Sequence, residues 1–153
     1  MKIKNVTEIG IAVKDLDKAS YVFREILGAE LLEVVHVEMF QMKYRMARIG
    51  KMDFELMAPT GDKGTIADFI RKRGEGLHHI AFAVENIENG VKKLKEKKIN
   101  FISEIPLELH GNLVDFKGNI FNGAGQFIFT HPSSFFGTLF EFIEYPDEMD
   151  MSV

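Results

Sequence analysis

Four residues that can bind a metal ion occupy matching places in two parts of this sequence. Glu8 opens the apolar run EIGIAV, and His79 opens the similar run HIAFAV, 71 residues later. Each part also ends on a carboxylate between apolar residues, Glu55 in FELMAP and Glu141 in LFEFIEYP. Imidazole and carboxylate groups are common ligands of divalent transition metals. The spacing therefore predicts one metal site built from two copies of one structural unit.

One histidine and three carboxylates would form an oxygen-rich donor set. Such a set suits Mn, Fe, Co, Ni or Zn in a site with an open position, and it disfavours a closed structural zinc site. The alternative is a cavity without a metal, in which like charges raise the pKa of one carboxyl group. For Glu141 a further alternative is an exposed position, with Phe140 and Phe142 facing the core.

Other charged residues near these runs have more ordinary explanations. His78 and His79 are adjacent, and neighbouring residues of a strand point to opposite faces, so only one of them can face the site. Lys43, Arg45 and Arg48 recur at near-alternating positions, where they could contact a substrate carboxylate or phosphate. An exposed strand face is the commoner explanation for such a pattern.

The elements that position the first two ligands follow from hydrophobic spacing. Residues 6–13 have the apolar pattern of a strand. Apolar residues at helical spacing predict a helix over 16–27, with Asp15 as its N-cap and Gly28 as its end. Three strand-like runs follow, at residues 31–40, 41–50 and 51–59.

The second part repeats this order after a short connecting helix. That helix is expected over 66–73, with Thr65 as its cap and Gly74 as its end. The repeated elements are a strand at 77–84, a helix at about 87–98, a strand near 100–105 and strands at 126–131 and 137–145. The additional stretch from Leu107 to Gly125 is long for a compact domain, and its apolar residues suggest a lid or an extra hairpin.

Composition narrows the possible partners. The 153 residues carry a net charge of −4 with a pI near 5.7, which gives no electrostatic basis for binding nucleic acid or an acidic membrane surface. The chain contains no cysteine, and it has neither an apolar signal region nor a run of about 18 apolar residues. We therefore expect a cytoplasmic protein without nucleic-acid or membrane partners.

Several motifs resemble the vicinal oxygen chelate superfamily, which includes glyoxalases, bleomycin-resistance proteins and extradiol dioxygenases. Within it the segments GIAVKDLDKA, RGEGLHHIAFAV and FTHPSSFFGTLFEFIE are similar to methylmalonyl-CoA epimerases. The resemblance covers essentially the whole chain, and it implies metal ligation by Glu8, Glu55, His79 and Glu141. It also implies that His131, in the pattern FxHP, shapes a turn.

The sequence departs from those epimerases at three places. Position 8 is Glu where they normally carry His, and the stretch Leu107–Gly125 is longer than theirs. The strand around 40–49 holds no carboxylate, whereas some epimerases have an acidic residue there that is proposed as a second base.

The repeat and the resemblance together predict an α+β fold. Two β-α-β-β-β modules would form a cupped eight-stranded mixed sheet, an incomplete barrel. We expect a single domain over residues 1–153, with modules at about 5–60 and about 76–146 and a connecting helix at about 65–73.

The resemblance also implies a reaction. The expected function is that of a metal-dependent isomerase or lyase that removes a proton next to a carbonyl group, with Glu141 or Glu55 as the base. Methylmalonyl-CoA is the leading substrate. The alternatives are a lactoylglutathione lyase of the glyoxalase I type, acting on a 2-oxoaldehyde thiol adduct, and a non-catalytic binding protein of the bleomycin-resistance type. Relatives in this superfamily are often dimers, so a homodimer is expected.

Overall fold

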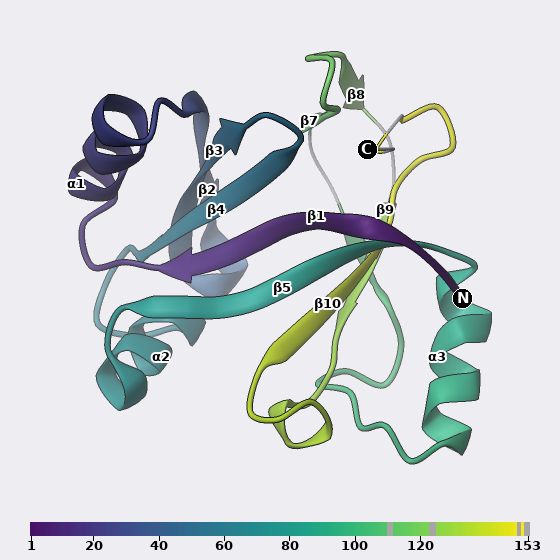
Figure 1. Cartoon of the computed structure of the whole chain (residues 1–153). Coiled ribbons are helices and arrows are strands. Elements are labelled where there is room, and N and C mark those ends of the chain that lie inside the picture. Colours follow the sequence, from purple (N-terminus) through teal and green to yellow (C-terminus); the bar gives the residue numbers. More distant parts are fainter. Residues whose placement is uncertain (110–111, 123–124, 150, 152–153) are drawn as a thin grey trace. The chain divides into compact units, whose positions relative to one another are not determined.

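The chain folds into two compact units, shown in the computed structural model of Figure 1. One unit comprises Glu8–His79, and the other comprises Met1–Thr7 together with Ile80–Val153. We call them the Glu8 unit and the Glu141 unit. The structure describes residues 1–109, 112–122, 125–149 and 151. The boundaries between the units fall within two strands, β1 (Lys2–Ala12) and β5 (Gly76–Glu85).

The Glu8 unit contains the predicted β-α-β-β-β order. Its strands are ordered β2-β3-β4-β1, with β1 parallel to β4 and the other pairs antiparallel. Between β1 and β5 the elements are α1 (Leu16–Tyr21), η1 (Val22–Ile26), β2 (Glu30–Val37), η2 (Glu38–Phe40), β3 (Met42–Ile49), β4 (Met52–Pro59) and α2 (Thr65–Arg73).

The helices of the Glu8 unit begin and end largely where the sequence predicts. The Asp15 side chain accepts hydrogen bonds from the backbone N–H groups of Asp17 and Lys18, both at 3.0 Å, and so caps α1. The predicted helix continues through η1, whose residues form a π-helix. The prediction that Thr65 caps α2 is wrong, because Gly64 occupies the N-cap position and Thr65 already belongs to the helix.

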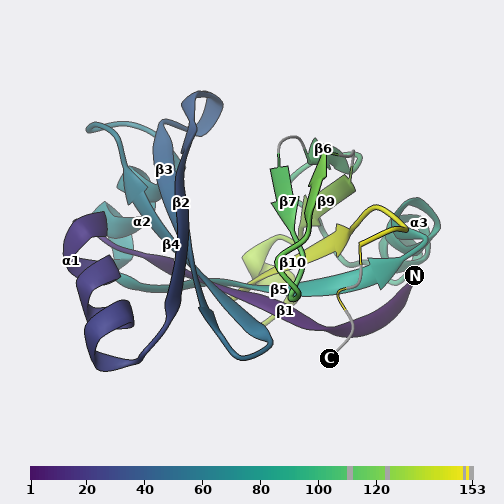
Figure 2. The ribbon, with the colours of Figure 1, turned by 90° about the horizontal axis from the view of Figure 1, so that it is seen from above.

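The two faces of the β1–β4 sheet are covered by different elements. One face carries the core cluster of Val13, Ala47, Leu56 and Ala58, against which Leu16 of α1 packs. On the other face, Met42 and Met57 form a second cluster with Ile66 of α2. Figure 2 shows α1 lying along these strands.

The Glu141 unit has its own sheet segment and core. Its strands are ordered β5-β10-β9-β6, and β10 is antiparallel to β9. The core cluster joins residues of β5, α3, β9 and β10: Val84, Ile87, Val91, Ile128 and Phe142. The elements after β5 are α3 (Ile87–Glu96), β6 (Leu107–Leu109), β7 (Asn112–Val114), β8 (Ile120–Asn122), β9 (Gly125–Phe129), η3 (Pro132–Ser134) and β10 (Leu139–Glu144).

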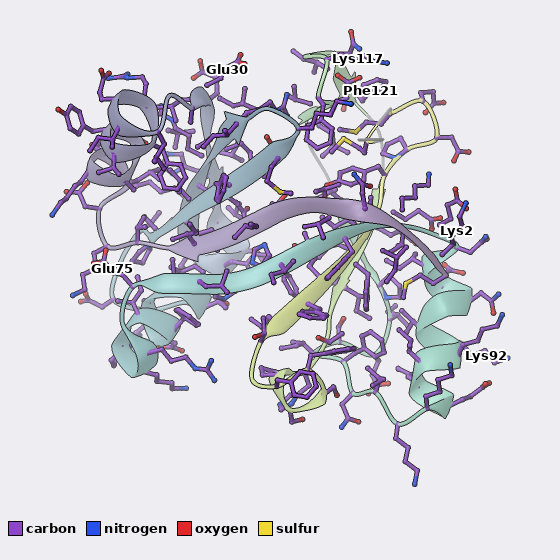
Figure 3. All side chains as sticks on the ribbon, viewed as in Figure 1. Lys2, Glu30, Glu75, Lys92, Lys117 and Phe121 are labelled. Carbon is purple, nitrogen blue, oxygen red and sulfur yellow. The ribbon has the colours of Figure 1, made fainter. Side chains whose placement is uncertain are left out.

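The N-terminus of the chain lies against α3 (Figures 1 and 2). A Cβ atom added at Gly90 would stand 1.9 Å from the Cβ of Met1, so the absence of a side chain at Gly90 permits this contact. Charged side chains such as Lys92 of α3 and Glu30 and Glu75 of the other unit are exposed (Figure 3).

The strand predicted near 100–105 is not formed. Phe101 makes one isolated bridge with Thr130, and the chain then bends, with the Lys95 ammonium group donating to the Glu104 carbonyl and the Ser103 hydroxyl donating to the Ile105 carbonyl. These local hydrogen bonds replace the pairing that a strand would need.

The additional stretch from Leu107 to Gly125 contains the extra hairpin that the sequence suggests. Strands β7 and β8 pair with each other, and the Asp115 carboxylate accepts hydrogen bonds from the backbone N–H groups of Lys117 and Asn119 in the turn. Residues 110–111 and 123–124 lie outside the described part of the chain. Ile120 is 68% exposed, and a role of the hairpin as a lid stays a prediction.

The predicted fold class, α+β with an eight-stranded mixed sheet, is confirmed. The single-domain organisation stays a prediction. Within the described residues, every helix is too short or too polar to cross a lipid bilayer.

Candidate metal centre

Strand pairing places two of the predicted ligands on one face of the sheet in the Glu8 unit. In the parallel pair of β1 and β4, Glu8 is opposite Asp53 and Gly10 is opposite Glu55. Because side chains alternate along a strand, these four residues face the same side. It is the face opposite α1, since Leu56 points into the core under that helix.

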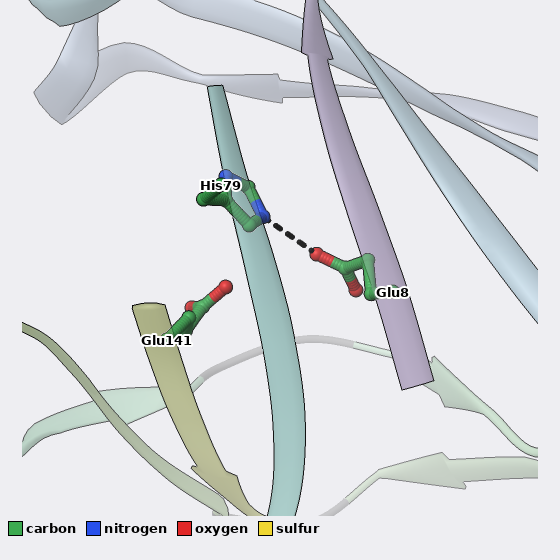
Figure 4. A group of neighbouring side chains, drawn as sticks. All are labelled: Glu8, His79 and Glu141. Carbon is green, nitrogen blue, oxygen red and sulfur yellow. Dashed lines mark hydrogen bonds and ion pairs between the residues drawn. The ribbon is translucent and has the colours of Figure 1, made fainter. Parts of the chain in front are cut away.

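His79 of β5 meets both carboxylates on this face. Its Nε2 atom lies 3.2 Å from Oε1 of Glu8, the contact drawn in Figure 4, and 3.6 Å from Oε2 of Glu55. His79 is 1% exposed and Glu8 is 7% exposed. The side chain of Glu55 is 13% exposed, so three of the four predicted ligands form a largely buried group with one imidazole and two carboxylates.

Gly10 makes room for the imidazole ring. A Cβ atom added at Gly10 would stand 2.2 to 2.7 Å from three ring atoms of His79, which is far inside van der Waals contact. The ring therefore lies directly on the β1 backbone. Any side chain at position 10 would displace it.

The electrostatics of this group favour the binding of a positive charge. Burial, followed by the nearby charge of Glu8, raises the pKa of Glu55 well above its ordinary value. Two buried carboxylates that repel each other favour either a bound proton or a bound cation. An imidazole nitrogen with carboxylate oxygens is a donor set that transition-metal dications accept, so these residues fit such an ion.

His78 lies on the other side of the imidazole of His79. The two Nδ1 atoms are 3.0 Å apart, and the His78 ring packs edge-on against Phe69 of α2, with 4.8 Å between ring centroids. Burial, followed by the charges of His79 and Arg73, lowers the pKa of His78 to about 3. His78 is therefore neutral at neutral pH.

A buried ion pair lies on the same face and is missed by the sequence analysis. The Arg48 guanidinium donates from Nε to Oδ1 of Asp53 at 2.7 Å and from a terminal nitrogen to Oδ2 at 2.8 Å. Both side chains are buried, so the expectation of an exposed face is wrong for Arg48. Arg45 points to the opposite face of the sheet, where it donates to the Ser20 hydroxyl at 3.3 Å. Alternation of side chains along β3 separates Arg48 from Arg45, since the two are three positions apart.

Glu141 belongs to the other unit, on β10 opposite Phe129 of β9. It is 7% exposed, so the alternative in which it faces solvent is wrong. The neighbouring Phe142 is buried in the core of the Glu141 unit. His131 accepts a hydrogen bond from the backbone N–H of Ser133 and caps η3, which confirms its predicted role in a turn.

Comparison with known proteins identifies the family. Residues 7–116 match the model of the Glyoxalase/Bleomycin resistance protein/Dioxygenase superfamily. The chain is 33% identical over 142 residues to mitochondrial methylmalonyl-CoA epimerase of Mus musculus, a match covering 92% of this chain and 72% of that protein. It is 34% identical over 138 residues to the corresponding Homo sapiens protein, covering 89% and 71% respectively.

A solved structure has a similar fold. The hypothetical protein from Bacillus halodurans C-125 superposes with a TM-score of 0.79 at 31% identity, covering 94% of this chain and 95% of that one. The chain thus belongs to the glyoxalase/bleomycin resistance protein/dioxygenase superfamily.

Proposed function

We propose that this chain is a metal-dependent epimerase that inverts the carbon between the two carbonyl groups of methylmalonyl-CoA or a similar acyl-CoA. The observation that carries the proposal is the buried contact of His79 Nε2 with Glu8 and Glu55, in a chain related over about nine-tenths of its length to methylmalonyl-CoA epimerases. A core that needed only stability would not place these charges together.

The proposed cofactor is one divalent ion, drawn from Mn, Co, Ni, Zn and Fe. Glu8, Glu55 and His79 would hold it, since their donor atoms already face one another in the Glu8 unit. We propose Glu141 as the fourth ligand, because it closes the second copy of the sequence repeat as Glu55 closes the first. Three carboxylates and one neutral imidazole would leave the site with a net charge of −1.

Epimerisation requires one proton to leave the α-carbon and another to arrive on its opposite face. We propose that the Glu55 carboxylate, when released from the ion, would take the first proton, as the C–H bond breaks and its electron pair moves onto the thioester oxygen. Glu141, when released from the ion and protonated, would return one to the other face and complete the inversion. Burial and the charge of Glu8 raise the pKa of Glu55 in the metal-free chain, so this carboxylate retains affinity for a proton when it is not bound to the ion.

When bound, the divalent ion supplies positive charge that lowers the free energy of the enolate form of the substrate. The protein contributes a dry environment, since His79 and Glu8 are almost fully buried. Electrostatic interactions are stronger in such surroundings than in water.

The direct test uses a single stereoisomer of methylmalonyl-CoA in D2O with protein reloaded with Co or Mn. The proposal predicts loss of stereochemical purity together with one deuterium at the α-carbon, and neither change with His79→Ala. Absence of exchange would overturn it. Turnover of the hemithioacetal of methylglyoxal under the same conditions would support the glyoxalase alternative, and binding without turnover of either compound would support the binding-protein alternative.

The remaining parts of the proposal concern the protein's surroundings. A small acyl-CoA is the proposed partner, and a cytoplasmic homodimer without nucleic-acid or membrane partners is the proposed form. The net charge of −4 supports the exclusion of nucleic acid.

A further inference from the structure

We infer that His78 is a positioning residue, which fixes the metal-binding tautomer and the orientation of His79 through a hydrogen bond between their Nδ1 atoms. The inference rests on the proposed metal site, and it adds a residue that binds neither the ion nor the substrate. It is carried by the 3.0 Å distance between the two Nδ1 atoms.

The direction of this hydrogen bond follows from the position of the carboxylates. Nε2 of His79 faces Glu8 and Glu55, so Nε2 must offer its lone pair to an ion held there. A neutral imidazole that binds through Nε2 carries its proton on Nδ1. That N–H is directed at Nδ1 of His78, which can accept it only if the His78 proton is on Nε2.

The surroundings restrict both rings to this arrangement. The two ring planes are nearly perpendicular, at 83°. On one side the His79 ring lies on the Gly10 backbone, where even one methyl group would clash. His78 is 8% exposed and is packed against Phe69.

This contact connects helix α2 to the metal site. Phe69 belongs to α2, and the Arg73 guanidinium lies 5.9 Å from the centroid of its ring. The chain of contacts runs from Phe69 to His78, from His78 to His79, and from His79 to the carboxylates. Helix α2, predicted only as a connection between modules, therefore supports His79.

A pair of substitutions separates hydrogen bonding from packing. His78→Asn keeps an acceptor, since the amide oxygen of Asn stands near the place of Nδ1, whereas His78→Phe keeps the ring and removes the acceptor. Loss of a hydrogen-bonding partner of a metal ligand typically weakens metal binding about 10- to 100-fold. We therefore expect the dissociation constant for Zn, measured by calorimetry, to rise by about that factor in His78→Phe and by less than about 3-fold in His78→Asn.

Controls distinguish this effect from a loss of folding or of the whole site. His36→Asn removes an exposed histidine of β2 and should leave Zn binding unchanged. In wild-type protein loaded with Zn, the nitrogen chemical shifts of labelled histidine should show His79 protonated at Nδ1 and His78 protonated at Nε2. This measurement needs no variant, so it applies even if His78→Phe does not fold.

The outcomes point in different directions. Equal affinities of wild type and His78→Phe, or a proton on Nδ1 of His78 in the loaded protein, would overturn the positioning role while leaving the metal site intact. Equal losses in His78→Asn and His78→Phe would also overturn it, since packing alone would then be responsible. Absence of Zn binding by the wild type would instead overturn the proposed metal site itself.

Discussion

The two faces of the β1–β4 sheet in the Glu8 unit are built from the same strands, but only one of them buries a group of carboxylates. On the face under α1, Ala47, Leu56 and Ala58 are at most 1% exposed and form an apolar core. On the other face, Arg48 and Asp53 are also buried, at 7% and 5% exposed, and they carry charges. Burial of apolar surface stabilises the fold by about 25 cal/mol per Å². Burial of charge does not, so the second face indicates function.

The largest expected effect comes from breaking the buried ion pair. Arg48→Met leaves the Asp53 carboxylate buried without its guanidinium, and removal of one partner of such a pair costs about 3–5 kcal/mol. We expect the free energy of unfolding in urea to fall by that amount. Adding Asp53→Leu should recover most of the loss, because the unpaired charge is then gone. A double variant no more stable than Arg48→Met would show that the pair is not the source of the effect.

A comparable loss of stability on the apolar face should leave the chemistry intact. Leu56 is fully buried under α1, and Leu→Ala at such sites costs about 2–5 kcal/mol. Under conditions where Leu56→Ala remains folded, its affinity for Mn should equal that of the wild type. A large change in metal affinity would contradict the division of the sheet into a structural and a functional face.

Gly10→Ala should affect both stability and metal binding, since its new methyl group meets the His79 ring. Overpacking of this kind typically costs about 1–3 kcal/mol. We expect metal binding to be lost as the ring is displaced. Gly61→Ala is the matched control, because a Cβ atom at Gly61 has no heavy atom within 4 Å. Unchanged metal affinity in Gly10→Ala would show that the ring position is not required.

The smallest expected effect is a gain in stability rather than a loss. The pKa of Glu55 is raised by burial and by Glu8, so the folded metal-free chain binds a proton more tightly than the unfolded chain does. Its stability should therefore fall as the pH rises through the ordinary carboxyl pKa towards the raised one. Glu55→Gln should remove this loss of stability with rising pH. At neutral pH it should stabilise the metal-free protein by on the order of 1 kcal/mol, while weakening metal binding.

Urea unfolding of the metal-free wild type and of metal-free Glu55→Gln across a pH series measures this effect. Glu30→Gln, on the exposed part of β2, should change stability by less than about 0.5 kcal/mol. A Glu55→Gln variant that is less stable than the wild type when metal-free would show that the carboxylate contributes to the fold rather than costing stability.

The sequence points to three of the proposed ligands because they follow a repeat. Glu8 and His79 begin similar apolar runs, and Glu55 closes the first copy, so their positions depend on local patterns that recur. The Arg48–Asp53 pair depends on the register between β3 and β4 instead, and no local pattern reports that register. Gly10 and His78 were likewise missed as supports of His79, because their role appears only when the strands are packed together.

The elements show the same division between local and non-local information. Asp15 caps its helix through hydrogen bonds to residues two and three positions away, which the sequence predicts directly. The strand expected near 100–105 is limited to the bridge of Phe101 with Thr130, because β9 itself pairs with β6 and β10. Pairing between distant segments decides which apolar run becomes a strand.

The central claim is that the charged face of the Glu8 unit holds one divalent ion. Equilibrium dialysis of metal-free protein against Mn, Co, Ni and Zn, followed by metal analysis, measures this directly in the wild type, His79→Ala and His36→Asn. The account predicts one ion per chain in the wild type and in His36→Asn, and a loss of nearly all bound metal in His79→Ala. Equal metal content in the wild type and His79→Ala, or no bound metal in either, would contradict it.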